Sequence, residues 1–452
     1  MTIENMLNML ENHMITSVEL VETSLSLHEK YIDKNAIAVI SPLALYEAKL
    51  CDEDRRKGIL RGKLHGIPIV IKDNIFYRDG TPTTCNSYAF HDLIPPYDAT
   101  LVKALKKEGA IILGKANLSE FAYFMSNDHM PSGYGSMYGQ VKHPFDETID
   151  PYGSSTGSAV AVKLGIVAAS VGTETNGSLM APAYQCQIVS MKPTIGMISR
   201  HGIIPISPVQ DTAGPMAQTV KDCALLLDVL AEADSNDDMT INIPRPSSFS
   251  KDIDQKLASS IIGVLSIKSY PYNEVEMNMI KKTKERLASL GHKTIDLEVE
   301  SMKLNNEETL LYEFKSAMNS FLSSISKSTS MKSLEDIIAF NKLHERRCLR
   351  YGQTILEASQ QTSGQLNDLD YIDKRAKLLE EASIVDTLIQ KHHLIAIVSP
   401  WWLGYAPIYG NPSICIPEGI FEGTPKAMVF IGKRYDDHTL LKLTHQYQQT
   451  VL

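Results

Sequence analysis

This sequence is poor in several features that would each point to a class of protein. Basic residues are in deficit: 44 Lys and Arg stand against 53 Asp and Glu, a formal net charge of −9 at pH 7. A chain without a positive field does not gather a nucleic-acid backbone, so we expect no nucleic-acid partner. No run approaches the roughly 18 apolar residues of a membrane span, so we expect no membrane partner either.

Cysteine is scarce and scattered. The six cysteines form no C-x-x-C pair and no close cluster with histidine, so no metal site is expected. Unclustered thiols are typical of a reducing compartment. The first residues contain no basic segment followed by an apolar run, so we expect no signal peptide. The sequence therefore predicts a cytoplasmic protein, which we expect to be a monomer or a homodimer.

What the chain does have is apolar sequence ordered into strands and helices. Its 452 residues are 43% hydrophobic, enough to bury a large core. Short apolar runs at 67–71 and 110–114 alternate with a helical pattern at 99–108. This alternation predicts the α/β class, with a mixed, largely parallel central sheet covered by helices on both faces.

The same periodicities divide the chain. Residues 1–60 predict an N-terminal helical segment packed on the core, and residues 61–452 predict a single domain. Within it, 235–393 is mostly charged helical pattern, apart from a short strand at 261–266, and is expected to form a lid-like part. The stretch 125–151 is rich in Ser, Gly, Tyr, Pro and Asp without periodicity, which indicates a long ordered loop; such loops are often functional.

Three polar segments interrupt the apolar pattern. Residues 153–158 open a helical run, where hydroxyls and free amides can face a reacting group. Residues 172–178 follow a predicted strand, and their amides could form an oxyanion hole. Lys72 ends a buried strand, where desolvation lowers the pKa of an ammonium toward values at which it can act as a base. Taken singly, each has an ordinary explanation: a helix cap, a polar turn and a lysine that reaches solvent.

Together these segments resemble the amidase signature family, over nearly the whole chain from Leu64. The family's Gly-Ile-Pro pattern ending in Lys-Asp, its Gly-Lys-x-Asn-x-x-Glu pattern and its two serine blocks all occur in family order. Lys-Pro-Thr-x-Gly and Asp-Thr-Ala-Gly-Pro-Met segments follow them. The matching segments are 66–73, 114–120, 154–158, 172–178, 192–196 and 211–216.

The resemblance implies an amidase, which cuts a linear carboxylic amide to an acid and ammonia or an amine through an acyl-enzyme and uses no cofactor. It assigns the base to Lys72, the bridging serine, usually on a cis peptide bond, to Ser154, and the nucleophile to Ser178. The separation of the two serines equals that in the family. The implied oxyanion donors are the backbone amides of Thr175, Asn176, Gly177 and Ser178, and the supporting residues are Ser155, Thr173 and Asp211.

The expected substrate is a small-molecule or peptide amide. Segments 117–122, 172–178 and 200–216 look most like the peptide amidase branch, which removes the C-terminal amide of peptides, although Asn176 stands where that branch usually has Asp. A small or aryl amide is the alternative. Many family members have arginine where this chain has Met180, so an anionic substrate is disfavoured. The residues expected to line the pocket are Met125, Met180, Trp401 and Tyr405.

Two other functions and one other mechanism are open. A glutaminase-type component of a tRNA-dependent amidotransferase, the A subunit of that enzyme, would need a partner protein and a glutamine-binding arginine, which Met180 disfavours. A non-catalytic binding relative would have lost turnover, although Lys72, Ser154 and Ser178 are intact. The residues around Ser155 also fit the Gly-x-Ser-x-Gly elbow of Ser-His-Asp hydrolases, but that elbow follows a strand directly, whereas here an irregular polar stretch precedes it.

Overall fold

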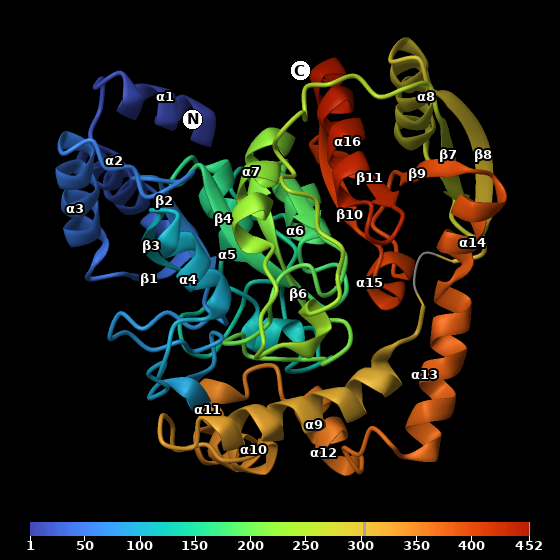
Figure 1. The fold of residues 1–452 in the computed structure, drawn as a ribbon. Helices are drawn as coiled ribbons and strands as arrows, with labels where there is room; N and C mark the ends of the chain where they lie inside the picture. The colour runs from blue at the N-terminus through green and yellow to red at the C-terminus, as the bar shows by residue number, and fades with distance from the viewer. Residues whose placement is uncertain (302–303, 452) are drawn as a thin grey trace.

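The structure, a computed structural model, describes residues 1–301 and 304–451 (Figure 1). One eleven-stranded sheet runs through this part of the chain in the order β1-β3-β2-β4-β6-β5-β10-β11-β9-β7-β8. The strands are β1 (Ile37–Ile40), β2 (Pro68–Lys72), β3 (Ile111–Ala116), β4 (Ala169–Glu174), β5 (Val189–Lys192), β6 (Thr212–Ala217), β7 (Ile261–Ile267), β8 (Lys293–Val299), β9 (Leu394–Ser399), β10 (Ser413–Phe421) and β11 (Thr424–Gly432).

Helices connect the strands and cover the sheet. They are α1 (Ile3–Glu11), α2 (Ser17–Lys30), α3 (Ala44–Arg56), α4 (Thr100–Lys107), α5 (Thr156–Lys163), α6 (Met180–Cys186), α7 (Val220–Leu230), α8 (Glu274–Ser289), α9 (Glu307–Ser324), α10 (Leu334–Leu343), α11 (Glu345–Cys348), α12 (Thr354–Gln361), α13 (Leu369–Ala382), α14 (Ile384–Lys391), α15 (Tyr405–Tyr409) and α16 (Asp437–Val451). Over residues 1–301 and 304–451, none is both long and apolar enough to cross a membrane.

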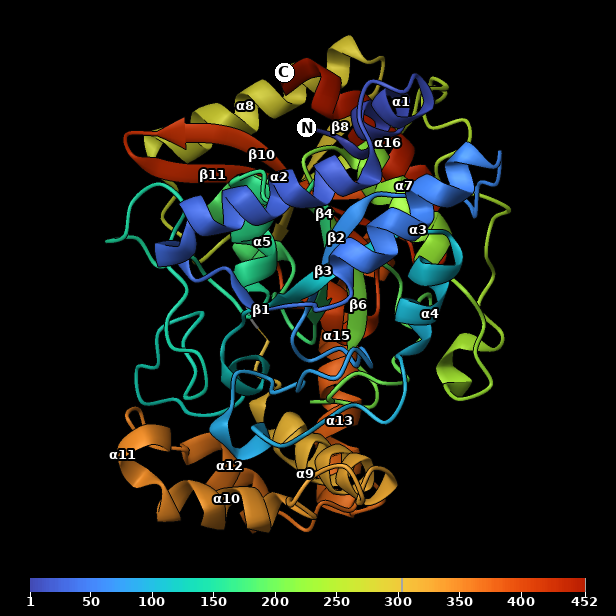
Figure 2. The same cartoon turned by 90° about the vertical axis from the view of Figure 1, so that its left-hand side faces the viewer.

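Both faces of the sheet are buried under helices, as Figures 1 and 2 show. Helices α5 and α6 pack on one face, and α4, α7 and α16 pack on the other. Successive residues of a strand point to opposite faces. In β2, Ile69 and Ile71 therefore join the core beneath α7, and Val70 joins the core beneath α5. By the same alternation Lys72 lies on the α5 side.

The predicted α/β class and mixed sheet are confirmed, but the predicted parallel majority is wrong. Four strand pairs are parallel. Six are antiparallel, because β6 returns between β4 and β5, and β10 and β11 form a hairpin in the middle of the sheet. Strands buried on both faces read as continuous apolar runs in either direction, so the sequence pattern does not report strand direction.

The N-terminal segment 1–60 provides α1, α2 and α3 and also an edge strand, β1, which pairs antiparallel with β3. Helix α2 begins where the sequence indicates: the Thr16 hydroxyl accepts the Glu19 amide, and the Glu19 carboxylate accepts the Thr16 amide. Such a reciprocal cap satisfies two amides that the helix itself cannot. The division into 1–60 and 61–452 stays a prediction.

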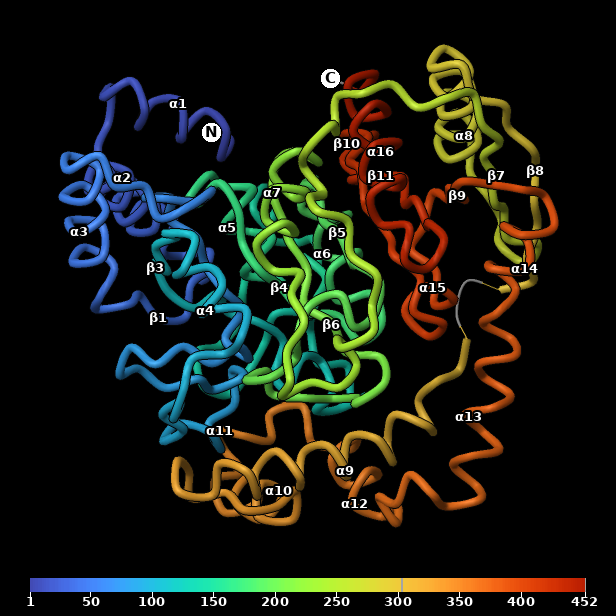
Figure 3. The backbone as a smooth tube through the Cα atoms, in the orientation of Figure 1, coloured from blue at the N-terminus to red at the C-terminus, as the bar shows by residue number. Residues whose placement is uncertain are grey.

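The segment 235–393 is less helical than its charge pattern indicates, because it supplies both β7 and β8 to the sheet edge. The part from α9 to α13, which we call the helical arm, runs below the sheet through α9 to α12 and then rises along one side in α13 (Figure 3). Phe314 of α9 is fully buried, with ring centroids 5.0 Å from Phe124 and 6.4 Å from Phe121. The arm is therefore docked on the chain that follows β3.

The stretch 125–151 contains no helix or strand, as its composition indicates. The buried Glu120 carboxylate fixes it by accepting the Ser136 amide at 2.9 Å and the Ser136 hydroxyl at 2.7 Å. Asn86 also holds it, accepting the Tyr138 amide at 2.9 Å. Burial raises the pKa of Glu120 to about 7, and its bonds to Ser136 oppose that rise.

Replacement of Phe314 by alanine should loosen the arm. The change removes a fully buried ring from an aromatic cluster, so the free energy of unfolding should fall by about 3–5 kcal/mol. Leu343→Ala on α10 is the control, since Leu343 is 81% exposed and its loss should cost less than about 0.5 kcal/mol. Urea unfolding of both variants measures the difference, and equal midpoints would contradict the docking.

Candidate active site

The site lies where two neighbouring parallel strands end. Strands β2 and β4 pair in parallel, with Ile71 opposite Val171, so their carboxyl ends reach the same edge of the sheet. Ligand sites in open α/β sheets are found at such an edge. Lys72 ends β2, and the chain after β4 runs through Ser178 into α6. The start of α5, with Ser154 and Ser155 just before it, lies over the same edge.

Lys72 is the centre of this cluster. Its Nζ lies 2.7 Å from Ser154 Oγ, 3.1 Å from Ser155 Oγ and 2.9 Å from Thr173 Oγ1, and 3.3 Å from the Thr173 carbonyl. The side chain is fully buried, and burial lowers its pKa to about 7. A substantial share of this lysine is therefore neutral at neutral pH, when it can accept a proton.

The neighbours of Lys72 direct its lone pair. The Ser155 hydroxyl donates to the Thr173 carbonyl at 2.9 Å and accepts the Thr173 amide at 3.2 Å, so it can only accept from Lys72. Asn74 Nδ2 donates to Thr173 Oγ1 at 3.0 Å. When the N–H bonds of a neutral Lys72 are taken by Ser155 and Thr173, the lone pair is left for Ser154. Asn74 is a contributor that the sequence did not single out, although it follows Lys72-Asp73 directly.

Ser154 sits on a cis peptide bond after Gly153, as the family resemblance implies. Its carbonyl accepts the Ser119 amide at 3.2 Å, which ties it to the segment after β3. Ser155 approaches β4 closely at Gly172, where a Cβ atom would lie 2.8 Å from Ser155 Oγ. Glycine is thus needed at 172 for the second serine to reach Lys72.

Ser178 lies on the loop between β4 and α6 and is 8% exposed. Its carbonyl accepts the Ser155 amide at 3.2 Å, which joins the two serine segments. Among the residues that the structure describes, its hydroxyl has no hydrogen-bond partner, Ser154 included, and the amides of 176–178 donate to no acceptor. Catalytic hydrogen bonds often form only once substrate is bound, and free amides in series are what an oxyanion hole requires.

A second layer of contacts fixes the start of this loop. The Thr175 hydroxyl donates to Asp211 at 2.5 Å, and the same carboxylate accepts the amides of Ile206 and Ser207. The helical arm reaches this layer: Arg375 of α13 donates to Gln210 Oε1, and Gln210 Nε2 donates to the Thr175 carbonyl. Asp211 thus supports the loop through Thr175.

The predicted pocket residues lie in different surroundings. Met125 and Met180 are buried, at 1% and 2% exposure. Trp401 stacks on Tyr184 with ring centroids 5.4 Å apart, and the Tyr405 hydroxyl donates to the Ser301 carbonyl at 3.0 Å. Their role in a pocket stays a prediction.

Trp402 is the aromatic residue that covers the loop. Gly177 has φ +82°, and a Cβ atom there would lie 3.0 Å from Trp402 Nε1. The exposed Asn176 side chain donates to Asn306 Oδ1 at 3.4 Å, just before α9. The sequence placed both tryptophans in the same segment but gave no signal that distinguishes Trp402 from Trp401.

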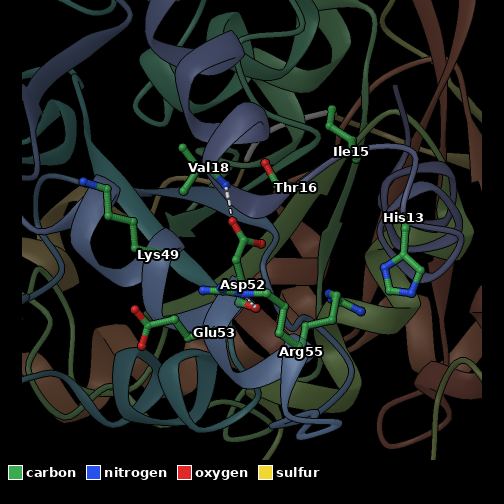
Figure 4. Close-up of a pocket in the computed structure, with 9 residues that line it drawn as sticks. His13, Ile15, Thr16, Val18, Lys49, Asp52, Glu53 and Arg55 are labelled. Atoms are coloured by element: carbon green, nitrogen blue, oxygen red, sulfur yellow. Dashed lines mark hydrogen bonds between the residues drawn. The ribbon is translucent and has the colours of Figure 1, made fainter.

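A hollow of about 530 Å³ lies away from this site, between α2, α3 and the turn before α2 (Figure 4). Asp52 in its wall accepts the amides of Ser17 and Val18 at 2.7 and 3.0 Å, so its carboxylate caps α2. None of the serines or the lysine above lines this hollow. In the described ranges 1–301 and 304–451, no three His, Cys, Asp or Glu side chains are grouped to hold a metal ion.

The fold and the site are those of a hydrolase in which a buried lysine, rather than a histidine, contacts two serines, Ser154 and Ser155. The profile of the Amidase family matches residues 19–441, and the chain belongs to this family. The chain is therefore an amidase, an enzyme that hydrolyses a carboxylic amide, and the bonds of Lys72 to Ser154, Ser155 and Thr173 fit the Ser-Ser-Lys triad of its relatives.

Three relatives show how far the likeness extends. A probable amidase of Arabidopsis thaliana is 32% identical over 100% of this chain and 90% of its own length. The native peptide amidase of Stenotrophomonas maltophilia has a solved structure that superposes with a TM-score of 0.93, at 33% identity over 100% of this chain and 96% of its own. The A subunit of the glutamyl-tRNA(Gln) amidotransferase of Staphylococcus saprophyticus is 30% identical over 99% of this chain and 96% of its own length.

Gly172→Ala should disturb the lysine site. The added methyl group would meet Ser155 Oγ at 2.8 Å and Leu179 Cδ2 at 2.7 Å, which costs about 1–3 kcal/mol of stability and displaces Ser155 from Lys72. We expect amidase activity to fall at least about tenfold.

Gly165→Ala is the matched control for Gly172→Ala. Gly165 has φ +72° with open space around it, so alanine there strains the backbone at a position outside the site. It should lower the melting temperature without lowering activity. Equal activity in the two folded variants would contradict the required approach at 172.

Proposed function

We propose that this amidase removes the C-terminal amide of peptides, releasing the free peptide acid and ammonia. The observation that carries the mechanism is the 2.7 Å contact between the buried Lys72 and Ser154. Beside it lies the loop that contains Ser178, whose amides at 176–178 have no acceptor among the residues that the structure describes. Support for the substrate class comes from the likeness to a peptide amidase over the full chain and from the apolar Met180, which offers no charge to an anionic substrate. Small or aryl amides are the alternative substrates.

Acylation follows from the types of residue present. Neutral Lys72 takes the Ser154 proton while Ser154 takes the proton of Ser178, and Ser178 Oγ attacks the amide carbonyl. The amides of the loop, from Thr175 to Ser178, donate to the oxyanion that forms; a single donor of this kind contributes roughly 3–4 kcal/mol in enzymes where it has been removed. The proton returns through Ser154 to the amide nitrogen, the C–N bond breaks, and ammonia leaves.

Deacylation reverses these transfers with water in place of the amine. Water gives a proton through Ser154 to Lys72 and attacks the ester carbon on Ser178. The ester bond then breaks, and Ser178 regains a proton along the same route. Ser155 and Thr173 hold Lys72 in place in both steps, Asn74 holds the Thr173 hydroxyl, and Asp211 holds the loop through Thr175.

Two alternatives are weighed against this proposal. The Staphylococcus amidotransferase protein is similar over nearly the whole chain, so a glutaminase role in a tRNA-dependent amidotransferase has support from overall likeness. Met180 counts against it, because that role needs a glutamine-binding arginine. A non-catalytic binding role is disfavoured by the lowered pKa of Lys72 and its contact with Ser154.

We further propose that the protein acts in the cytoplasm. Its six cysteines are all buried and unpaired, which suits a reducing compartment. A monomeric or homodimeric state stays a prediction.

The rate should depend on pH through Lys72. Only the neutral amine accepts a proton, so kcat/KM should be low in acid, rise about tenfold per pH unit and level off above a pKa of about 7. A pH profile on a peptide amide measures this. Lys72→Arg should be inactive at every pH, because a guanidinium stays charged. A rate independent of pH between about 5 and 9 would rule out Lys72 as the base.

Ammonia release by the purified protein alone identifies the substrate class. The panel is C-terminally amidated peptides, simple aliphatic and aryl amides, and glutamine. We expect release from the peptide amides, complete loss in Ser178→Ala, and little change in Ser170→Ala, a buried serine of β4 whose hydroxyl donates to the Ser158 carbonyl. Release from glutamine alone would support the amidotransferase role, and turnover retained in Ser178→Ala would refute the mechanism.

A further inference from the structure

Glu174 is a buried carboxylate for which the triad chemistry has no use. It ends β4 and is 2% exposed. By strand alternation it lies on the same face as Gly172, toward α6. Its Oε2 accepts two backbone amides, from Leu179 at 2.7 Å and from Met180 at 3.2 Å. Both amides belong to the start of α6, so the side chain connects the end of β4 to the start of α6 across the loop.

The bonds of Glu174 divide the amides of this segment into two sets. The amides of 176–178 have no acceptor among the described residues, whereas the next two, of Leu179 and Met180, are held by one carboxylate oxygen. The Gly177 carbonyl accepts the Ala181 amide at 2.8 Å, which starts the helix from the same loop. Glu174 thus fixes where the free amides stop and the helix begins.

A second buried ionisable group, Lys192, lies near this carboxylate. Lys192 at the end of β5 is fully buried, and its Nζ donates to the Pro193 carbonyl at 2.9 Å. Burial lowers the pKa of Lys192 to about 8, and the charges of Glu174 and Asp437 oppose that change. Asp437 is already engaged by the Thr194 amide and hydroxyl. Lys192 therefore lies close enough to Glu174 for their charges to interact, although its ammonium donates to a carbonyl.

We propose that Glu174 is a positioning residue for the oxyanion hole: by holding the Leu179 and Met180 amides, it keeps the preceding amides pointed at the reacting carbonyl. This inference rests on the proposed role of Ser178. The carboxylate does not touch substrate, and it acts through the backbone of the loop. Because an oxyanion hole stabilises charge that develops only in the transition state, the loss of Glu174 lowers kcat and leaves KM nearly unchanged.

Three substitutions at 174 separate geometry from charge. Glu174→Gln keeps an acceptor oxygen at the same reach but removes the charge. Glu174→Asp keeps the charge but is shorter by one methylene group and does not reach both amides. Glu174→Ala removes both features. If Glu174 acts as a positioning residue, Glu174→Gln should keep the reactivity of Ser178 and Glu174→Asp should lose it.

The measurement is the rate at which an alkyl fluorophosphonate labels Ser178, because this reaction needs the nucleophile and the oxyanion hole but no knowledge of the natural substrate. We expect labelling within about threefold of wild type in Glu174→Gln, and roughly 10- to 100-fold slower in Glu174→Asp and Glu174→Ala. On a C-terminally amidated peptide, kcat should fall in the same order.

The matched control is Asp222→Asn. Asp222 of α7 is also buried and accepts a backbone amide, that of Ile3 at 3.2 Å, away from the loop. It should lower the melting temperature and leave the labelling rate unchanged. If Glu174→Ala does not fold, the order of the Gln and Asp variants decides the question.

Equal labelling of Glu174→Asp and wild type, or slower labelling of Gln than of Asp, would overturn the positioning role while leaving the triad in place. Absence of labelling at Ser178 in the wild type would instead overturn the proposed function and this inference with it.

Discussion

The cost of burying the Lys72 ammonium is the constraint on which the rest of the site depends. An ammonium fully removed from water favours its neutral form, and here the pKa falls to about 7. Full ion pairing would reverse that effect, and the groups within hydrogen-bonding reach of Lys72 are hydroxyls and a carbonyl. The fold thus supplies polar partners that satisfy the amine without restoring its charge.

The sheet brings these groups together by direction and alternation. Because β2 and β4 are parallel neighbours, their carboxyl ends place Lys72 and the Ser178 loop at one edge of the sheet. Side chains alternate between the two faces along a strand, and this alternation points Lys72 toward α5. The absence of a side chain at Gly172 lets Ser155 approach β4 closely enough to reach Lys72. Carboxylates act one step away: Asp211 on Thr175, and Glu174 on the start of α6. The two carboxylates therefore lie near Lys72 and Ser178 without a hydrogen bond to either side chain.

Much of this could be predicted from the sequence, and the remainder has physical reasons. Apolar runs located the cores of β2, β3 and β7, and family resemblance identified Lys72 and its serines. The direction of β6 and β10 could not be predicted, because strands buried on both faces look alike. Strand β8 was hidden in a charged pattern because it is an exposed edge. Asn74 and Trp402 act through contacts between distant segments, which a single sequence does not encode locally.

The helical arm has a topological consequence for how such enzymes diversify. It leaves the sheet after β8 and returns at β9, and these two strands flank β7. Because β7, β8 and β9 run parallel, it starts from the carboxyl end of β8 and returns to the amino end of β9, about 10 Å across the sheet and about 20 Å along the strands. A crossover must span this distance, but beyond that minimum it can be lengthened or exchanged during evolution without changing the order of the sheet, because the entropic cost of a longer connection grows slowly. Because Arg375 and Gln210 connect it to the Thr175 carbonyl, each such exchange would also change a contact that supports the start of the Ser178 loop.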